Sequence, residues 1–460
     1  MGSLTRDRGG GVSDRGDPSD GVGRLSELMS QAEYAAELDS PAPVDPALAR
    51  RRRRRRRLTT AIVAVVLLGL LGGYVGYALT APLPGAVGAV TLPTASPGPA
   101  AAVALPVDGV YGLSVTGGAD FLGPGGGPLS TISADQALPI ASITKIITAL
   151  VILDKKPLSG PDDPGPTITF SKADHDLYDA YYVQGATIAA MPTGSTMSLH
   201  DALELMLVVS ATNYADAVST WAFGSRSAFL VATKSWLAAN GFAQTRVVEP
   251  TGIDPGNTST PSELIALGKL AMANPVIAAL VAMPALDVPG FAGQSNTNAL
   301  LGVDGIRGIK TGTLDTANLL FSSQLDVGTG EPLELTGVVL GAFSRDSLDA
   351  EVRAWLDSIR AGFHEVTANE QDAVVGTYTT PWGAKARVVL PEKAALLTWS
   401  DTPVTATMTE LRLVTGEKGE QVGKLTWTAG SRTVTVPVVL DQTIAPPDQW
   451  WRLTHPFELG

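Results

Sequence analysis

The sequence predicts an α+β protein that carries a membrane-spanning helix near its N-terminus and a small all-β domain at its C-terminus. Three observations support this prediction. An apolar run at 58–79 directly follows eight consecutive arginines. Segments with helical spacing and segments with strand-like spacing then share residues 106–365. After about residue 368 only short alternating strands follow, separated by Gly, Pro and Asp turns.

The N-terminal region predicts a membrane anchor. Residues 1–49 are rich in Gly, Ser, Asp and Ala and predict a disordered cytoplasmic tail with a short helix near 25–38. The arginine run at 50–57 precedes a segment at 58–80 that is long enough to span a bilayer, for which about 20 apolar residues suffice. The positive-inside rule places the arginines in the cytoplasm and everything after Thr80 outside. A cleaved signal peptide is the alternative, but its apolar core is usually only about 7–15 residues long.

Charge and composition limit the classes of partner and cofactor that we expect. Net charge is −12 although the arginine run adds eight positive charges, so the rest of the chain stands near −20, which argues against a nucleic-acid partner. The chain has no cysteine and its four histidines form no His-Glu-x-x-His pattern, so we expect no metal and no cofactor. Residues 81–105 are rich in Ala, Pro and Val without charges and predict a semi-rigid spacer.

Ser142-Ile143-Thr144-Lys145 opens a run with helical apolar spacing that continues to Leu153. A lysine three residues after a serine lies one helical turn away on the same face, within reach of the hydroxyl. A serine hydroxyl is a poor nucleophile until a neighbouring base takes its proton. The pair therefore indicates nucleophilic catalysis, whereas the alternative is a plain N-cap serine beside a surface lysine.

Lys310-Thr311-Gly312 lies in a strand-like segment, where glycines alternate with isoleucines. Further strands are predicted at 317–324 and 333–340, with a Gly-rich turn at 328–330 between them. A lysine and a hydroxyl on a strand offer a cation and a backbone edge to a substrate carboxylate and carbonyl. A surface lysine near a turn is the alternative.

Ser-x-x-Lys, then a Ser-x-Asn type element at Ser210, then Lys-Thr-Gly resembles the penicillin-binding proteins and serine β-lactamases. The chain is most similar to the low-molecular-mass members, the D-alanyl-D-alanine carboxypeptidases. The similarity extends to Glu249–Asp254 and to Asn296-Thr297-Asn298, and it covers roughly residues 107–362. It implies an antiparallel sheet with a helical lobe at 106–365 and a C-terminal β-sandwich domain at 366–460.

The resemblance also implies a mechanism. Ser142 would attack the carbonyl between two terminal D-alanines of a peptidoglycan stem peptide, with Lys145 as the base and Ser210 relaying the proton to the leaving amine. The backbone N–H groups of Ser142 and Thr313 would bind the oxyanion. Residues Lys310, Thr311, Gly312 and Thr313 would hold the substrate, and a β-lactam antibiotic would be attacked in the same way.

The middle motif departs from the family pattern. Where the family has an asparagine two residues after the serine, this chain has Thr212, and Asn213 follows one residue late. An asparagine amide both donates and accepts hydrogen bonds, whereas a threonine hydroxyl is shorter and has no carbonyl. We assign Thr212 and Asn213 to substrate binding. The departure from the family pattern concerns how these residues position the substrate.

Helix signals complete the outline. Ser198–Asp201 and Thr260–Glu263 read as capping boxes, and residues 344–363 carry an apolar stripe that faces the core. Strands are expected at 386–390, 404–414, 422–428 and 432–440. Trp450 and Trp451 contact either the membrane or, by preference, the sandwich.

The sequence therefore predicts a single-pass, membrane-anchored serine D,D-carboxypeptidase with its catalytic domain outside the cytoplasm. Two alternatives stay open. One is a β-lactamase, against which the C-terminal domain and the anchor count. The other is a non-catalytic peptidoglycan-binding or regulatory protein on the same fold.

Overall fold

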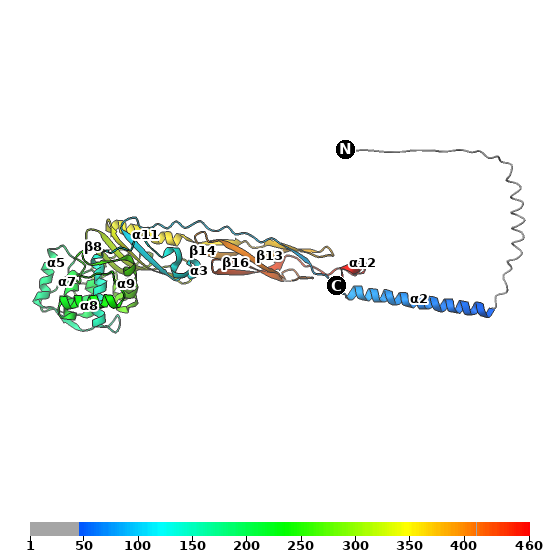
Figure 1. The fold of residues 1–460 in the computed structure, drawn as a ribbon, viewed down its shortest axis with the longest axis horizontal. Coiled ribbons are helices and arrows are strands. Elements are labelled where there is room, and N and C mark those ends of the chain that lie inside the picture. The colour runs from blue at the N-terminus through cyan, green and yellow to red at the C-terminus, as the bar shows by residue number, and fades with distance from the viewer. Residues whose placement is uncertain (1–45, 411) are drawn as a thin grey trace, which may run out of the picture. The chain divides into compact units, whose positions relative to one another are not determined.

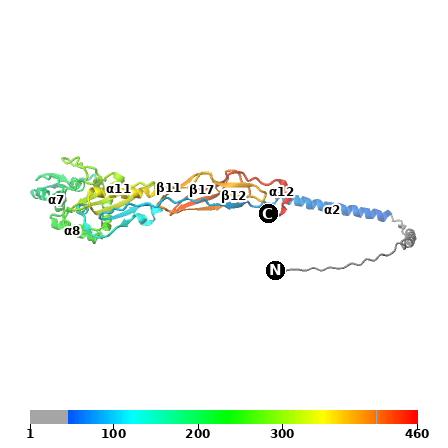
Figure 2. The ribbon, with the colours of Figure 1, turned by 90° about the horizontal axis from the view of Figure 1, so that it is seen from above.

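The structure is a computed structural model, and it describes residues 46–410 and 412–460. These residues form two compact units (Figures 1 and 2). One comprises Gly85–Pro446, and the other joins the N-terminal helix to the C-terminal residues Pro447–Gly460. Within the larger unit both views show the helices gathered around one sheet and the strands of the C-terminal region forming a second group.

A five-stranded antiparallel sheet is the centre of the first region. Its order is β3 (Thr131–Ile132), β2 (Val110–Thr116), β10 (Leu333–Ala342), β9 (Ala317–Leu325) and β8 (Ile306–Thr313). The predicted strands at 317–324 and 333–340 are confirmed as β9 and β10. Because β8 pairs only with β9 in this sheet, its other edge is unpaired by any of the five strands, and this edge carries Lys310 to Thr313.

Helices cover both faces of the sheet. Side chains alternate along a strand, and accordingly Leu320 of β9 belongs to one core while its neighbours Leu319 and Phe321 belong to another. The first core joins the sheet to α9 (Pro261–Ala273) and the helical lobe, and the second joins it to α11 (Arg345–Ala361). All five predicted stripe residues of α11 are fully buried, which confirms the stripe: Leu348, Val352, Trp355, Leu356 and Ile359.

The helical lobe is built around α4 (Thr144–Lys155), whose residues Thr144 to Leu153 are all buried. The surrounding helices are α5 (Lys172–Tyr182), α6 (Leu199–Leu207), α7 (Thr212–Phe223), α8 (Arg226–Ala239) and α10 (Pro275–Val281). The predicted helix starts are confirmed, because the hydroxyls of Ser198 and Thr260 accept hydrogen bonds from the backbone N–H groups three residues on. Two short strand pairs, β4 (Leu138–Pro139) with β7 (Thr258–Ser259) and β5 (Thr167–Thr169) with β6 (Thr196–Ser198), complete the lobe.

The C-terminal region is all-β. Its larger sheet has the order β1 (Val87–Val90), β12 (Ala373–Thr379), β13 (Lys385–Leu390), β17 (Arg432–Leu440), β16 (Gln421–Ala429) and β15 (Val404–Glu410). The second sheet pairs β11 (Phe363–Asn369) with β14 (Ala394–Trp399). Side chains of both sheets, among them Leu396 and Trp427, share one core. We refer to this two-sheet region as the β domain.

The segment predicted as a spacer differs from that prediction. Residues Val87–Val90 form the edge strand β1, which pairs with β12. The chain beyond it stays against the same unit: the backbone N–H of Ala101 donates to Ser400 Oγ at 3.0 Å and that of Ala104 donates to Ser358 Oγ at 2.9 Å. A Cβ on Gly98 would overlap the ring of His364. All four residues of β1 stay exposed, so backbone pairing with β12, and not burial of side chains, makes this segment a strand.

The smaller unit contains α2 (Pro46–Thr80) and the C-terminal helix α12 (Gln449–Thr454). Helix α2 begins at Pro46, four residues before the arginine run, and the short helix predicted at 25–38 lies outside the described residues. Trp451 packs beside a small cluster of Ala78, Ala81 and Leu459 at the end of α2, a contact that the sequence did not indicate. Its partners are distant in sequence, which is why no local pattern indicated them.

Candidate active site

The structure brings Ser142 and Lys145 together. Ser142 lies in a 3-10 turn at Ala141–Ile143 that leads directly into α4, and Lys145 is in the first turn of that helix. The Nζ atom of Lys145 is 2.8 Å from Ser142 Oγ and donates a second hydrogen bond to the carbonyl of Thr251 at 2.7 Å. Lys145 is completely buried, so its amine has the serine and the Thr251 carbonyl as its polar surroundings.

Two glycines let the backbone close tightly around the serine. A Cβ on Gly312 of β8 would lie 2.9 Å from the carbonyl oxygen of Ile140 and 3.2 Å from the backbone N of Ser142. A Cβ on Gly252, whose φ is +87°, would lie 1.9 Å from the carbonyl oxygen of Ala141. Only glycine permits this approach, so the Gly of Lys-Thr-Gly places the strand backbone beside the N–H of Ser142.

Burial changes the proton affinity of the lysine. Desolvation lowers the pKa of Lys145 from its ordinary value of 10.5 to about 7, and the negative charge of Glu249 opposes this shift. A substantial fraction of Lys145 is therefore neutral at neutral pH. A neutral amine has a lone pair that can accept the proton of Ser142, which a protonated lysine cannot do.

The Thr251 carbonyl is fixed by a buried carboxylate that the sequence did not identify as functional. Glu249 accepts hydrogen bonds from the backbone N–H groups of Thr251 at 2.7 Å and Gly252 at 2.5 Å. The side-chain amide of Asn257 donates to the same carboxylate at 2.6 Å and to the hydroxyl of Thr144 in α4 at 3.2 Å. The loop that carries the Thr251 carbonyl is thus bonded from behind to the helix that carries Lys145.

A second cluster lies on β8. Lys310 is 1% exposed, and its Nζ donates to the hydroxyl of Thr297 at 3.3 Å. The same hydroxyl is 2.8 Å from that of Thr311. Arg345 donates to the Thr297 carbonyl at 3.3 Å and to the Thr313 hydroxyl at 3.2 Å. Burial, together with the positive charges of Lys145 and Arg345, holds the pKa of Lys310 well below its ordinary value.

The residues of the middle motif, Ser210, Thr212 and Asn213, do not all face the cavity at Ser142. Thr212 begins α7 and lines the same cavity as Ser142. Asn213 does not reach that cavity: its amide accepts from the N–H of Ala189 at 3.1 Å and donates to the carbonyl of Ala189 at 2.8 Å. Ser210 is 6% exposed and adopts the left-handed φ of +67°. Two residues before Ser210, the backbone carbonyl of Val208 accepts a hydrogen bond from the N–H of Thr297 at 3.1 Å. The side chain of Thr297 contacts Lys310.

A cavity of about 390 Å³ lies at Ser142, and of the predicted site residues its lining includes Ser142, Lys145, Thr212 and Thr313 but not Ser210, Asn213 or Lys310. Its lining combines Ser142 and Lys145 with the Thr251–Ile253 loop, the end of β8 and the loop at 184–187. A larger hollow of about 840 Å³ lies along α8 and the following loop, but its lining holds no serine beside a buried base. The smaller cavity is therefore the candidate active site.

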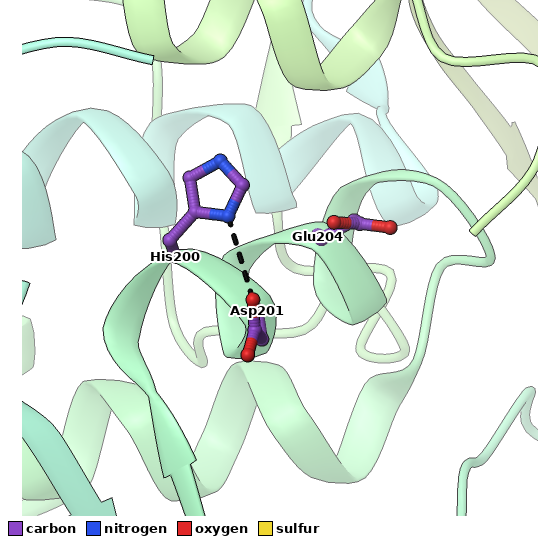
Figure 3. Close-up of side chains that lie close together, drawn as sticks. All are labelled: His200, Asp201 and Glu204. Carbon is purple, nitrogen blue, oxygen red and sulfur yellow. Dashed lines mark ion pairs between the residues drawn. The ribbon is translucent and has the colours of Figure 1, made fainter. Parts of the chain in front are cut away.

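Among residues 46–410 and 412–460, one group of side chains has the composition of a metal site. His200, Asp201 and Glu204 of α6 place one ligand atom each within 4.8 Å of one another. Glu204 already accepts a hydrogen bond from the N–H of Asp287 at 2.6 Å, and Figure 3 shows its carboxylate to one side of the His200–Asp201 pair. None of the three lines the cavity around Ser142. We interpret these three side chains as belonging to the first turns of α6.

Sequence comparison gives an independent view of the chain. The profile of the family described as D-alanyl-D-alanine carboxypeptidase matches residues 126–344. The chain is 30% identical over 234 residues to a D-alanyl-D-alanine endopeptidase of Pseudomonas aeruginosa, covering 49% of this chain and 71% of that protein. It is 28% identical over 192 residues to the D-alanyl-D-alanine carboxypeptidase DacB2 of Mycobacterium tuberculosis, covering 40% and 61%.

Solved structures are similar at lower identity. Penicillin binding protein 5 from Haemophilus influenzae matches with a TM-score of 0.47 and 16% identity, over 74% of this chain and 98% of that one. The Streptomyces K15 DD-transpeptidase matches with a TM-score of 0.46 and 23% identity, over 55% and 98%.

Proposed function

Because this chain belongs to the D-alanyl-D-alanine carboxypeptidase family, we propose that it is a serine peptidase that removes the terminal D-alanine from peptidoglycan stem peptides through an acyl-enzyme on Ser142. One observation carries the proposal: the completely buried Nζ of Lys145 lies 2.8 Å from Ser142 Oγ. A base that is neutral near pH 7 beside a serine hydroxyl is what acyl transfer requires.

The acylation step follows from this pair. Neutral Lys145 keeps its hydrogen bond to the Thr251 carbonyl and accepts the proton of Ser142 while Oγ attacks the carbonyl carbon of the penultimate D-alanine. The backbone N–H groups of Ser142 and Thr313 stabilise the oxyanion that forms. The tetrahedral intermediate collapses, the bond to the terminal D-alanine breaks, and the departing nitrogen takes a proton through Ser210.

The β8 cluster supplies the binding half of the reaction. Lys310 and Arg345 place two cations next to the hydroxyls of Thr297, Thr311 and Thr313, and a substrate carboxylate suits this group. An arriving carboxylate also favours the protonated form of Lys310, because burial holds the pKa of this lysine low.

In the last step of the reaction, water hydrolyses the ester on Ser142. A β-lactam acylates the serine similarly, but its leaving group stays tethered and the adduct lasts longer.

The location is part of the proposal. Helix α2 is long and apolar enough to cross a bilayer by length and composition. The apolar stretch 58–79 has a rise of about 33 Å, close to the roughly 30 Å hydrocarbon core. With the arginine run at 50–57 on the cytoplasmic side, the peptidase unit lies outside the cytoplasm, where stem peptides are found.

The test is to incubate the full chain in detergent with benzylpenicillin and follow the Ser142 peptide by mass spectrometry, with Ser142→Ala as the control. A long-lived adduct on Ser142, and D-alanine release from a D-Ala-D-Ala peptide, support the proposal. Rapid loss of the adduct with accumulation of penicilloate indicates a β-lactamase instead. A folded protein that forms no adduct and releases no D-alanine refutes both enzyme functions and leaves the binding protein.

A second activity has support in the comparisons, because the Pseudomonas aeruginosa relative is named an endopeptidase. The chemistry at Ser142 is the same, and only the group that leaves from the D-alanyl bond differs. Cross-linked dimeric stem peptides supplied beside monomeric pentapeptides distinguish the two. Release of free D-alanine indicates carboxypeptidase activity, and conversion of dimer to monomers indicates endopeptidase activity.

A further inference from the structure

The C-terminal residues close the end of the N-terminal helix. The last carbonyls of a helix have no partner within it. Here the guanidinium of Arg452 donates to the carbonyl of Leu79 at 2.9 Å and to that of Ala81 at 2.8 Å. The N–H of Gly460 donates to the carbonyl of Pro82 at 3.0 Å. A positive side chain at the negative end of a helix dipole adds to this stabilisation.

A second contact lies deeper along the helix. The hydroxyl of Tyr74 donates to the carbonyl of Leu453, in the last turn of α12. Tyr74 precedes the helix end at Thr80 by six residues, which is about 9 Å along the axis. Inside the apolar stretch a tyrosine hydroxyl without a partner would be costly. The C-terminal chain thus lies along the last two turns of the apolar helix as well as at its end.

The same segment exposes aromatic side chains. Trp450 is 73% exposed and Phe457 is fully exposed, while Tyr77 of α2 is 51% exposed. The charged side chains of 447–460 are few, namely Asp448, Arg452 and Glu458. Two large aromatic residues on a 14-residue segment that already contacts an apolar helix are costly in water, and the boundary between lipid and water is where such side chains concentrate.

We propose that residues 447–460 form an interfacial collar, which binds the outer headgroup layer of the bilayer and sets the depth of α2. The proposal rests on α2 spanning the membrane. Its partner is a phospholipid surface, and continuity with α2 argues for this occupant over a protein. The collar carries no cluster of basic residues, so its binding should not depend on anionic lipid, which attracts Lys and Arg clusters.

The test uses site-directed spin labels on the full chain in lipid vesicles, which is straightforward because the chain has no cysteine. Labels are placed by Trp450→Cys, Phe457→Cys, Leu67→Cys in the apolar stretch and Tyr182→Cys, a 67% exposed position in α5. Accessibility to oxygen against a water-soluble nickel chelate reports depth. We expect label 67 deep, labels 450 and 457 at the interface, and label 182 in water, with both phosphatidylcholine and phosphatidylglycerol.

The outcomes separate the two proposals. If label 67 is deep while labels 450 and 457 are as accessible to nickel as label 182, the collar is wrong and the span stands. If label 67 is also in water, the anchoring proposal fails. If labels 450 and 457 move to the interface only with anionic lipid, the collar as stated is wrong. Low accessibility of both labels to oxygen as well as to nickel would indicate a protein contact and also overturn it.

A variant tests the contact itself. Arg452→Gln removes the charged donor at the end of α2, and we expect label 450 to gain mobility and nickel accessibility while label 67 stays deep. Lys424→Gln on the exposed face of β16 is the matched control and should change neither. Unchanged spectra for Arg452→Gln would contradict the role given to this residue.

Discussion

At the scale of single residues, the site depends on groups that are buried and held in place. The amine of Lys145 is set by its surroundings: desolvation lowers its pKa to about 7, and Glu249 opposes that shift while fixing the carbonyl that Lys145 contacts. The Ser142–Lys145 pair was predictable because both residues sit in one helical turn. Glu249, Asn257, Thr297 and Arg345 were not assigned, because they come from separate segments that only the tertiary fold assembles.

The pH dependence of acylation tests the role of Glu249. Acylation requires neutral Lys145, so its rate with benzylpenicillin should rise as pH increases through about 7. The charge of Glu249 favours the protonated lysine, so Glu249→Gln should lower the lysine pKa and move the acid limb to lower pH. Stopped-flow acylation from pH 5 to 9 measures this. Glu263→Gln, a carboxylate that contacts Thr245 instead, should not move the limb, and an upward shift in Glu249→Gln would count against the assignment.

Ser210 offers a separation of chemistry from backbone strain. Its φ of +67° lies in a region that glycine adopts freely and that costs other residues about 1–2 kcal/mol. Both Ser210→Gly and Ser210→Ala remove the hydroxyl, but only the first relieves this cost. We expect both to lose D-alanine release to a similar degree, and Ser210→Gly to be about 1 kcal/mol more stable to urea than Ser210→Ala. Full activity in either variant would exclude Ser210 from the proton path.

At the scale of elements, helices and strands with a regular hydrophobic period were predictable, whereas the short strand β1 at the edge of the sheet was not. The stripe of α11 and the strands β9, β10, β13, β16 and β17 follow from period alone. Strand β1, with the sequence Val-Gly-Ala-Val, has neither alternation nor length, and pairing with β12 makes it a strand. The α12 contact was missed for the same reason, since its partners are more than 350 residues away in sequence.

The start of α7 holds the loop that lines the cavity, and Asn213 is the link. Asn213→Ala leaves the buried N–H and carbonyl of Ala189 without partners, which should cost about 1–3 kcal/mol of unfolding free energy. Because the adjacent loop at 184–187 lines the cavity, KM for the peptide should rise more than kcat falls. Asn240→Ala, which removes an exposed hydrogen bond at the end of α8, should cost less than about 0.5 kcal/mol. Equal costs in urea unfolding would contradict the assignment.

At the scale of the whole molecule, the chain returns on itself. The larger unit begins at Gly85 and includes β1, so the β domain is closed by residues that precede the catalytic sequence. The fold class and the order of regions were predictable, since composition changes at their boundaries. The boundary at residue 106 was not, because an uncharged Ala- and Pro-rich segment has the same composition whether it is free or docked.

Two truncated chains test the contribution of the docked segment. A chain of residues 85–446 keeps β1, whereas 107–446 lacks it and leaves the edge of β12 without its partner. We expect 107–446 to have a Tm several degrees lower and to aggregate more readily, because an uncovered edge strand is a template for pairing. Acylation by benzylpenicillin should be equal in both. Identical thermal unfolding would show that β1 contributes nothing to the fold.

The docking of residues 85–107 also affects how freely the catalytic sequence can move relative to α2. While β1 is paired and Ala101 and Ala104 are bonded, this stretch is held against its own unit and is not a free tether between α2 and the catalytic sequence. Fully extended, its 23 residues would span about 75 Å. If α2 anchors the chain in the membrane as proposed, a force that pulls the catalytic region away from the bilayer must separate the four residue pairs of β1 before residues 85–107 become a free linker.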